Sequence, residues 1–369
     1  MRHQAMLFPE GSIAPKSRVL PVLGEQKDIR YYGAPARGIL NGPETTGMGY
    51  WSINPYVGCA FGCAYCYARY AHRYVAAHAS AAAAPGDAFA RDVRELPAWL
   101  AFERRVLVKA NAPAVLRLEL DRLLRSPRGR PLVAGEAIVV GTATDPYQPA
   151  ERTYRVTRGV LEVLAERGGL SVVVITKSPL IVRDLYILQR LAERSSLTIH
   201  LSLITLDRAL ARRLEPRSPT PESRLRALER LAAAGLDVGV NVMPVLPGIT
   251  DAPAAVEALV RRVAEAGATH VNACALRLRS TARERYLPLL AREFPQLVSR
   301  YQTAYADGHQ VGERYRAGLA RFFTRVCRDA GIRFGTPDSR ETRAGAAWSA
   351  DGQGNAPAES LASQLELSM

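Results

Sequence analysis

Three of the five cysteines of this chain fall within eight residues, at Cys59, Cys63 and Cys66, in the spacing C-x-x-x-C-x-x-C. A strand-like run, residues 51–57, leads into them, and Gly58 and Gly62 allow the backbone turns that bring three thiolates together. An iron–sulfur cubane normally takes four cysteine ligands. Three close cysteines without a local fourth indicate a [4Fe–4S] cluster with one open iron, much as a catalytic zinc keeps an open position.

Two other chemistries remain as alternatives for the same segment. A zinc site would need a fourth ligand, and His72 and His78 follow the cysteines closely. A redox pair of Cys63 and Cys66 is the other alternative, although it leaves Cys59 without a role. The cluster interpretation is favoured because it uses all three cysteines.

Composition limits the class of protein. The 369 residues are 48% hydrophobic, which is ample for one large α/β domain or two smaller ones. No uncharged apolar run reaches the length of about 18 residues that a membrane helix needs, and the first residues contain no apolar signal segment. Five cysteines, three of them crowded together, are typical of a reducing compartment, so we expect a cytoplasmic protein.

The net charge of +14 has two interpretations. Clustered basic residues attract phosphates, which favours a nucleic-acid or nucleotide-containing substrate. Only four of the 49 basic residues are lysine, however, and an arginine- and alanine-rich composition also follows from GC-rich coding. A solvated basic surface therefore remains the alternative.

Short apolar runs alternate with helical runs along the middle of the chain. Such alternation predicts a parallel sheet covered by helices. After a short strand at 105–109 and a helix beginning near Asn111 and Pro113, we expect strands at 137–142, 171–176, 198–203, 237–242 and 269–276, and helices near 150–167, 179–194, 221–234 and 253–266. These six or seven β/α units are fewer than the eight of a closed α/β barrel.

The flanking regions are expected to differ from this core. Residues 1–50 contain many Gly and Pro and predict an extended N-terminal segment, in which 37–42 packs against the body. Residues 68–84 predict a helix by their alanine content, and residues 88–102 an irregular insertion. The core then spans 51–335, with a helix over 308–330 and a last strand at 332–334, and residues 336–369 predict a disordered tail.

Polar residues are concentrated where the predicted strands end. Thr144 follows the strand at 137–142, Lys177 follows the next one, and Ser202 closes the strand at 198–203. In barrels of this kind, functional groups lie on the loops that follow the strands. Hydroxyl groups and a lysine suit a zwitterionic amino acid and a ribose. For Asp145, Tyr147 and Glu151, which follow Thr144, contact with substrate and a turn or cap role are both open.

With these segments included, the chain resembles the radical S-adenosylmethionine (SAM) superfamily, and within it the spore photoproduct lyase-like branch, often labelled DNA repair photolyase. The resemblance covers roughly residues 37–337. It rests on the cysteine loop with its preceding Asn54-Pro55, and on VKANAP at 108–113, TDPYQPAE at 144–151, ITKS at 175–178, LEPRSPTPESRL at 214–225 and PVLPGITD at 244–251.

The resemblance implies a partial (β/α)6 TIM-like barrel with a [4Fe–4S] cluster and SAM as cofactors. The open iron would be chelated by the amino and carboxylate groups of SAM, and one electron would release a 5′-deoxyadenosyl radical. A flavodoxin- or ferredoxin-type protein would supply that electron. Carried over by position, Tyr65 would contact the adenine, Thr144 the amino group, Lys177 the carboxylate and Ser202 the ribose. For each of the last three, a purely structural role is the alternative.

One departure bears on the reaction. The lyase depends on a cysteine hydrogen donor near the end of the strand that precedes the TDPYQ-like segment, and residues 137–149 contain no cysteine. Lesion splitting is therefore not the expected reaction, and no catalytic residue is assigned. Cys274, like Cys327, is interpreted as a buried small hydrophobic residue.

We therefore expect a radical SAM enzyme that abstracts hydrogen from an unidentified substrate. A basic nucleic-acid-binding protein with a structural metal in the cysteine loop is the rival from another class. An electron-transfer role without radical release is a third option.

Overall fold

A computed structural model of the chain describes residues 20–46, 49–69 and 88–335. Within these residues the main sheet has eight strands in the order β12-β11-β10-β9-β8-β7-β4-β3. All neighbours pair in parallel except β3 and β4, which pair antiparallel. The strands are β3 (Leu40–Asn41), β4 (Trp51–Ile53), β7 (Ala137–Val140), β8 (Ser171–Thr176), β9 (Ser196–Ser202), β10 (Asp237–Val245), β11 (His270–Ala275) and β12 (Arg333–Phe334).

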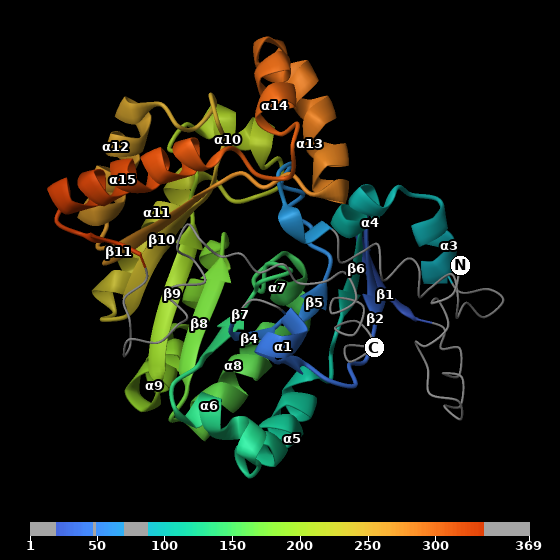
Figure 1. Ribbon diagram of the computed structural model, residues 1–369. Helices are drawn as coiled ribbons and strands as arrows, with labels where there is room; N and C mark the ends of the chain where they lie inside the picture. Colours follow the sequence, from blue (N-terminus) through green and yellow to red (C-terminus); the bar gives the residue numbers. More distant parts are fainter. Residues whose placement is uncertain (1–19, 47–48, 70–87, 336–369) are drawn as a thin grey trace.

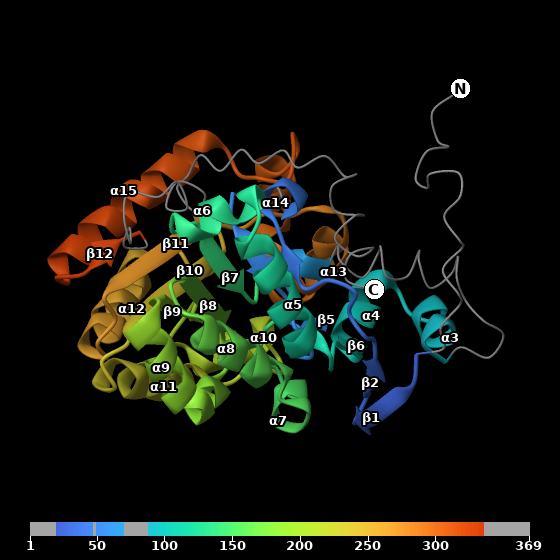
Figure 2. The same cartoon turned by 90° about the horizontal axis from the view of Figure 1, so that it is seen from below.

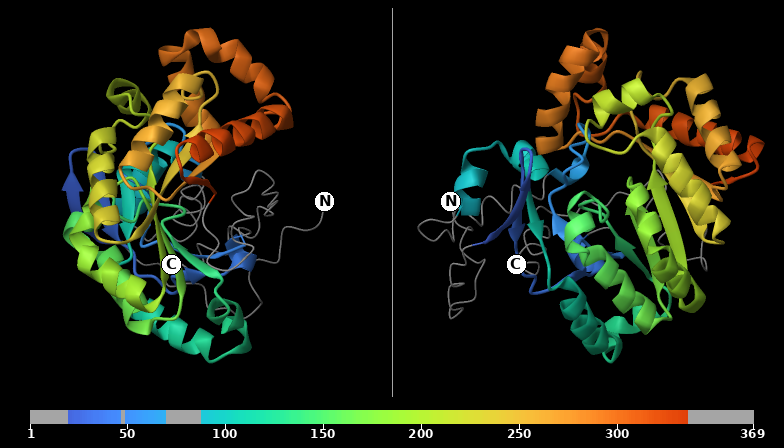
Figure 3. Two further views of the ribbon diagram at one scale, coloured as in Figure 1. Left: turned by 90° about the vertical axis from the view of Figure 1, so that its left-hand side faces the viewer. Right: turned by 180° about the vertical axis from the view of Figure 1, so that it is seen from behind.

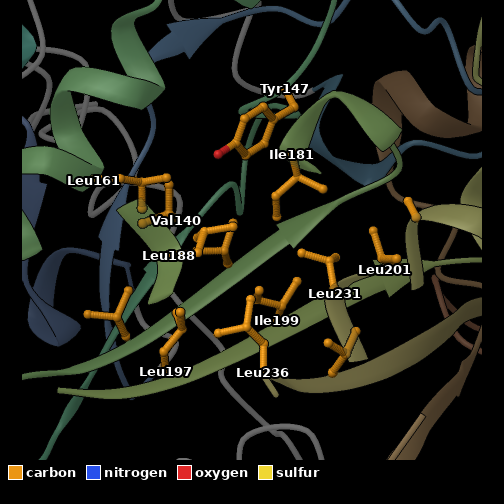
Figure 4. Packing of buried hydrophobic residues seen from close by; sticks show 14 of the residues in the cluster. Val140, Tyr147, Leu161, Ile181, Leu188, Leu197, Ile199, Leu201, Leu231 and Leu236 are labelled. Atoms are coloured by element: carbon orange, nitrogen blue, oxygen red, sulfur yellow. The ribbon is translucent and has the colours of Figure 1, made fainter. Parts of the chain in front are cut away.

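The six strands from β4 to β11 form the predicted partial barrel, with helices along the outer face (Figures 1 and 2). Leu197, Ile199 and Leu201 of β9 point outward and pack against Leu188 and Leu231 of the covering helices (Figure 4). This burial of every second side chain drives the sheet and the helices together. The helices are α5 (Ala112–Leu124), α6 (Arg130–Val133), α7 (Ala150–Tyr154), α8 (Val156–Arg167), α9 (Leu185–Arg194), α11 (Pro221–Ala233) and α12 (Pro253–Glu265).

The helices beyond the predicted core units lie over one end of the barrel and along its last strands. α10 (Arg208–Leu214), α13 (Ser280–Glu293) and α14 (Val298–Ala304) gather at the end where the strands point, and α15 (Glu313–Asp329) packs on β11 and β12 (Figure 1). The predicted last strand is confirmed as β12, which pairs with β11. The predicted helix over 308–330 begins later, at Glu313, because residues 308–312 form a turn and a bridge to Arg277.

A second sheet, of four strands in the part of the chain that the structure describes, has the order β1-β2-β6-β5. It contains β1 (Val22–Gln26), β2 (Ile29–Gly33), β5 (Tyr56–Val57) and β6 (Arg105–Val108), and lies beside the barrel in the right-hand view of Figure 3. The expectation that β6 continues the barrel is wrong, because β6 pairs with β2 and β5 instead. The chain crosses from one sheet to the other at Asn54 and Pro55, between β4 and β5.

Three further predictions are corrected or refined. Within the N-terminal segment that was predicted to be extended, residues 20–46 form the paired strands β1 and β2, the strand β3, which packs on β4 as expected for residues 37–42, and the short helix α1 (Pro43–Thr46). The insertion at 88–102 is not irregular, since it forms α3 (Ala88–Arg94) and α4 (Ala98–Arg104), separated at Pro97. The helix at 150–167 is interrupted at Arg155, whose φ is 50°. The helix at 68–84 and the tail at 336–369 fall almost entirely outside the described residues.

Candidate metal centre and cofactor site

The cysteine loop directly follows β5 of the second sheet, which comes just after β4, the first parallel strand of the barrel. Gly58 and Gly62 have φ values of 86° and 65°, so both turn in the left-handed region, as their positions predicted. Cys59 and Cys63 are 8% and 6% exposed, and Cys66 is partly exposed. The loop therefore presents three free thiols near the interior of the molecule.

The donor set suits a cluster chemically, because three free thiols lie within eight residues on one loop. Burial raises the pKa of Cys59 well above its ordinary value, and Asp145, Cys63 and Cys66 raise it further. Among the described residues, however, no three His, Cys, Asp or Glu side chains are grouped tightly enough to bind one metal ion. A zinc ion holds its sulfurs at about 2.3 Å, whereas a cubane distributes thiolates over different iron atoms. His72 and His78 lie outside the described residues.

A buried arginine holds the loop from behind. Arg69 is fully buried and donates to the Cys63 carbonyl at 2.5 Å and to the Trp99 carbonyl at 2.6 Å. Its guanidinium also pairs with Glu103 at 2.5 Å, and Arg285 of α13 pairs with the same carboxylate at 3.1 Å. These ion pairs join the loop to α4 and α13, so its shape depends on several elements at once.

The loop after β7 holds the cysteine loop from the other side. Thr144 donates its hydroxyl to the Gly58 carbonyl at 2.6 Å, and the fully buried Gln148 donates to the same carbonyl at 3.0 Å. The amide oxygen of Gln148 accepts from the Ala60 N–H at 2.9 Å. Thr144, predicted to bind the amino group of a cofactor, therefore lies against the turn that precedes Cys59.

The residues that follow Thr144 have structural partners. Asp145 accepts from the Thr176 hydroxyl at 2.6 Å and from the Lys177 N–H at 2.7 Å, which ties two neighbouring strand ends together. Glu151 is fully buried and accepts from the backbone N–H groups that begin α8. Tyr147 is 1% exposed. For Asp145 and Glu151 the turn and cap alternative describes the contacts present.

Lys177 and Tyr65 meet at one carboxylate. The Lys177 ammonium lies 3.3 Å from a carboxylate oxygen of Glu215 and 5.5 Å from the centre of the Tyr65 ring. The Tyr65 hydroxyl donates to the same oxygen of Glu215. The other oxygen of Glu215 pairs with Arg224. Two of the predicted cofactor residues are thus brought together, over an acidic residue that the sequence analysis did not single out.

Ser202 closes β9 on the inner face of the barrel and is 8% exposed. Its carbonyl accepts from Arg224 at 3.0 Å. Glu215, Ser218, Arg224 and Gln148 are functional candidates missed at the level of sequence. Three of them lie in the LEPRSPTPESRL segment, where four charged residues among three prolines were the available signal.

The inner face of β9, β10 and β11 is polar. Asn272 donates to the Asn241 side chain at 3.0 Å, and Asn241 is the register partner of Ser202. His200 and His270 contact each other two residues nearer the beginnings of these strands. Cys274, predicted to be buried, is partly exposed on the same face of β11 as Asn272. The inner face of these strands thus carries imidazole groups in the middle of the barrel, and amide groups and the Cys274 thiol nearer the end with the cysteine loop.

A six-stranded parallel half-barrel with a three-thiol loop after its first strand defines a class of metal-cofactor proteins. The family model that matches residues 130–263 is the Radical SAM superfamily. An uncharacterized protein of Mycobacterium tuberculosis (strain ATCC 25618 / H37Rv) is 36% identical over 269 residues, which cover 73% of this chain and 71% of that protein. Together these matches show that the chain belongs to the radical SAM superfamily.

More distant matches agree with the fold. An uncharacterized protein of Methanocaldococcus jannaschii is 26% identical over 199 residues, covering 54% of this chain and 61% of that protein. A spore photoproduct lyase mutant with bound AdoMet and dinucleoside spore photoproduct superposes with a TM-score of 0.55 at 14% identity, covering 77% of this chain and 75% of that one. At this identity the likeness concerns the fold. None of the helices within the described residues is long and apolar enough to span a bilayer.

Proposed function

We propose that the chain is a radical SAM enzyme in which Cys59, Cys63 and Cys66 hold a [4Fe–4S] cluster with one open iron. The observation that carries this proposal is three free thiols on one loop at the mouth of a half-barrel, two of them buried and one partly exposed. Held by these three residues, a reduced cluster would supply the single electron that splits SAM into methionine and a 5′-deoxyadenosyl radical able to abstract hydrogen from a substrate. The chain itself binds and orients the cofactor and excludes water.

The residues on the neighbouring strand ends are proposed to bind SAM. Lys177 meets the carboxylate: its side chain follows β8, is 14% exposed, and is oriented by the ion pair of its ammonium with Glu215 at 3.3 Å. Thr144 accepts from the amino group, since a hydroxyl oxygen has two lone pairs and Gln148 takes one of them. Ser202 bonds the ribose, and Tyr65 lies against the adenine.

The proposed substrate is anionic and phosphate-bearing. Arg277 and Arg279 follow β11 and are exposed, and Arg279 contacts His309 at 3.2 Å. Among the described residues, neither arginine has a carboxylate within ion-pair distance. Burial raises the pKa of Cys274, and the charge of Arg277, three residues further along the chain, opposes that rise. We refer to Arg277, Arg279 and His309 as the rim patch.

A nucleic acid or nucleotide fits this chemistry. Spore photoproduct lyase, whose fold is similar, binds a dinucleoside photoproduct. Residues 137–149 contain no cysteine that could return hydrogen to a product, so we propose a reaction other than lesion splitting. We further propose that a flavodoxin- or ferredoxin-type protein delivers the electron.

The test is anaerobic reconstitution with iron and sulfide, followed by dithionite and SAM. We expect about four irons per chain and formation of 5′-deoxyadenosine. Replacing Cys59, Cys63 or Cys66 by Ala should abolish both. The matched control is Cys327→Ala, because Cys327 lies in the core between α15 and the sheet and should leave iron content unchanged. A fully loaded, reduced protein that forms no 5′-deoxyadenosine would contradict the proposal.

A second candidate follows from the net charge of +14 and the rim patch. In this case the chain is a nucleic-acid-binding protein and the cysteine loop holds a structural zinc. Colourless protein with one zinc per chain would favour it, together with an affinity for DNA or RNA that falls steeply with salt because counterions are released. Brown protein with iron, or an affinity independent of salt, would remove it.

A further inference from the structure

We propose that Glu215 and Arg224 act as a positioning pair that fixes the SAM-binding side chains relative to the cysteine loop. This inference rests on the proposed function, in which Tyr65, Lys177 and Ser202 bind SAM. It assigns roles to two residues that do not themselves reach the cofactor. Glu215 is 2% exposed and Arg224 is 2% exposed, so both lie behind the site rather than in it.

Glu215 connects the first two SAM-binding residues. One of its carboxylate oxygens accepts from the Tyr65 hydroxyl and lies 3.3 Å from the Lys177 ammonium. Glu215 consequently holds the Lys177 ammonium over the face of the Tyr65 ring, 5.5 Å from the ring centre. Tyr65 lies in the cysteine loop and Lys177 follows β8, so a single buried carboxylate sets the position of one loop against the other.

Arg224 connects the same carboxylate to the third residue. It pairs with the second oxygen of Glu215 and donates to the Ser202 carbonyl at 3.0 Å. Two more bonds, to the Pro219 carbonyl at 2.9 Å and 2.7 Å, anchor the guanidinium. A planar guanidinium with several bonds has little freedom to move. The end of β9 is therefore tied to the other two strand ends through two side chains.

The segment that carries Glu215 also contacts the cysteine loop directly. The Ala64 N–H donates to the Leu214 carbonyl at 2.9 Å, and the Cys63 sulfur lies 3.5 Å from the Ser218 hydroxyl. Residues 214–218 thus contact both the cysteine loop and the side chains proposed to bind SAM. A shift of this segment would move both together.

The charges of this group keep Glu215 as a carboxylate. Burial alone would raise the pKa of Glu215, but Arg224 and Lys177 outweigh it and lower that pKa to about 2. Lys177 has a second carboxylate nearby, that of Asp145, which accepts from the Lys177 N–H at 2.7 Å. An ionised Glu215 has enough acceptor positions to bind Tyr65 and Arg224 and to pair with Lys177 at the same time.

The experiment measures SAM binding to the reconstituted, unreduced protein by equilibrium dialysis, with iron content and melting temperature measured in parallel. For Glu215→Gln we expect unchanged iron content and a Kd for SAM raised about ten-fold or more, because a bond to a charged group is lost. The control Glu229→Gln removes the exposed pair with Arg262, which is 2.6 Å long, and should leave the Kd unchanged. A Glu215→Gln variant that melts earlier but binds SAM normally would overturn the inference.

A second variant keeps the test usable if Glu215→Gln does not fold. Tyr65→Phe removes only the hydroxyl that donates to Glu215. On its own, Tyr65→Phe should raise the Kd for SAM while iron content stays unchanged. Where Glu215→Gln does fold and both residues act as one unit, the Kd of the double variant should rise by less than the product of the two single effects. Independent, multiplying effects would contradict the pair. Arg224→Lys keeps the charge but loses the fork of bonds, and it should also weaken SAM binding while retaining iron.

These outcomes separate the two proposals. A wild-type protein that holds iron but neither binds SAM nor forms 5′-deoxyadenosine defeats the proposed function, and the inference with it. A wild-type protein that does both, while Tyr65→Phe and Arg224→Lys bind SAM as well as wild type, defeats the inference alone.

Discussion

The imidazole rings of His200 and His270 meet through their Nε2 atoms at 2.9 Å, on either side of Gly239 in the strand register. The Nδ1 atom of His270 lies 2.8 Å from the Thr269 hydroxyl, which donates to Asp237 at 2.6 Å. Because the Thr269 hydroxyl donates to Asp237, its oxygen accepts from Nδ1–H of His270. Nε2 of His270 therefore accepts, and Nε2–H of His200 is the donor between the two rings. Because one Nε2 must accept, the two rings cannot both carry a second proton.

This pair predicts a loss of stability at acid pH. Burial lowers the pKa of His200 to about 3 and that of His270 to about 4, with Asp237 and Arg333 as the charged neighbours of His270. In the unfolded chain both titrate near 6.5. The unfolded state therefore binds more protons below pH 6.5, and stability falls there by up to about 1.4 kcal/mol per pH unit for each histidine. The contribution is fully present above pH 6.5.

Denaturant unfolding at pH 7.5, 6.0 and 5.0 measures this dependence. The matched variant His200→Gln keeps a polar side chain of similar size without a titrating group, so the fall in unfolding free energy between pH 6.5 and 5 should become shallower. An equally steep fall in wild type and variant would show that other groups cause it.

Gly239 makes room for the histidine pair. A Cβ atom at this position would lie 2.1 Å from the Nε2 atom of His270, inside a buried layer. Gly239→Ala should therefore lower the free energy of unfolding by about 1–3 kcal/mol, as overpacking does. Gly318→Ala is the control: a Cβ there meets nothing within 4 Å, and in the middle of α15 it should stabilise by about 0.5–1 kcal/mol. Opposite signs for the two variants are expected in thermal and urea unfolding.

Gln148 is predicted to determine whether the cysteine loop accepts its cluster. The amide donates to Gly58 and Thr144 and accepts from Ala60, so every bond depends on its orientation. A carboxylate of the same shape cannot donate. Gln148→Glu should therefore reduce the iron content after reconstitution well below that of wild type. Gln310→Glu, on a partly exposed turn, is the control. Full iron loading of Gln148→Glu would contradict this role.

The barrel was predictable because its strands are short, apolar and separated by helical segments. Parallel strands buried on both faces have a continuous apolar sequence, and five of them lie within three residues of their predicted bounds. The second sheet was missed for a physical reason. Tyr31 and Tyr32 follow one another and are both buried, on opposite faces of β2, so no alternation marks the strand. Its partner β6 is 72 residues or more away in sequence, which no local pattern reveals.

The candidate site was also predictable only in part. The spacing of the cysteines is a local pattern that could be recognised in the sequence, and so could the positions of Lys177 and Ser202 at strand ends. Glu215 was not, because its importance comes from contacts with Tyr65 and Lys177, 150 and 38 residues away. A buried carboxylate cannot be told from a surface one by its neighbours in sequence. The interruption at Arg155 was hidden likewise, since Glu151 binds backbone N–H groups of the next helix.

The rim patch yields the last prediction, which concerns the substrate. Binding of a single-stranded oligonucleotide should weaken as salt rises, because each arginine that meets a phosphate releases a counterion. Arg277→Gln and Arg279→Gln should each reduce the slope of log K against log salt by about 0.7. Arg122→Gln is the control, because Arg122 is exposed on α5, at the opposite end of the molecule from α13 (Figure 1). Equal slopes for all three variants would place the phosphates elsewhere, and the substrate proposal would then lose its support from the barrel mouth.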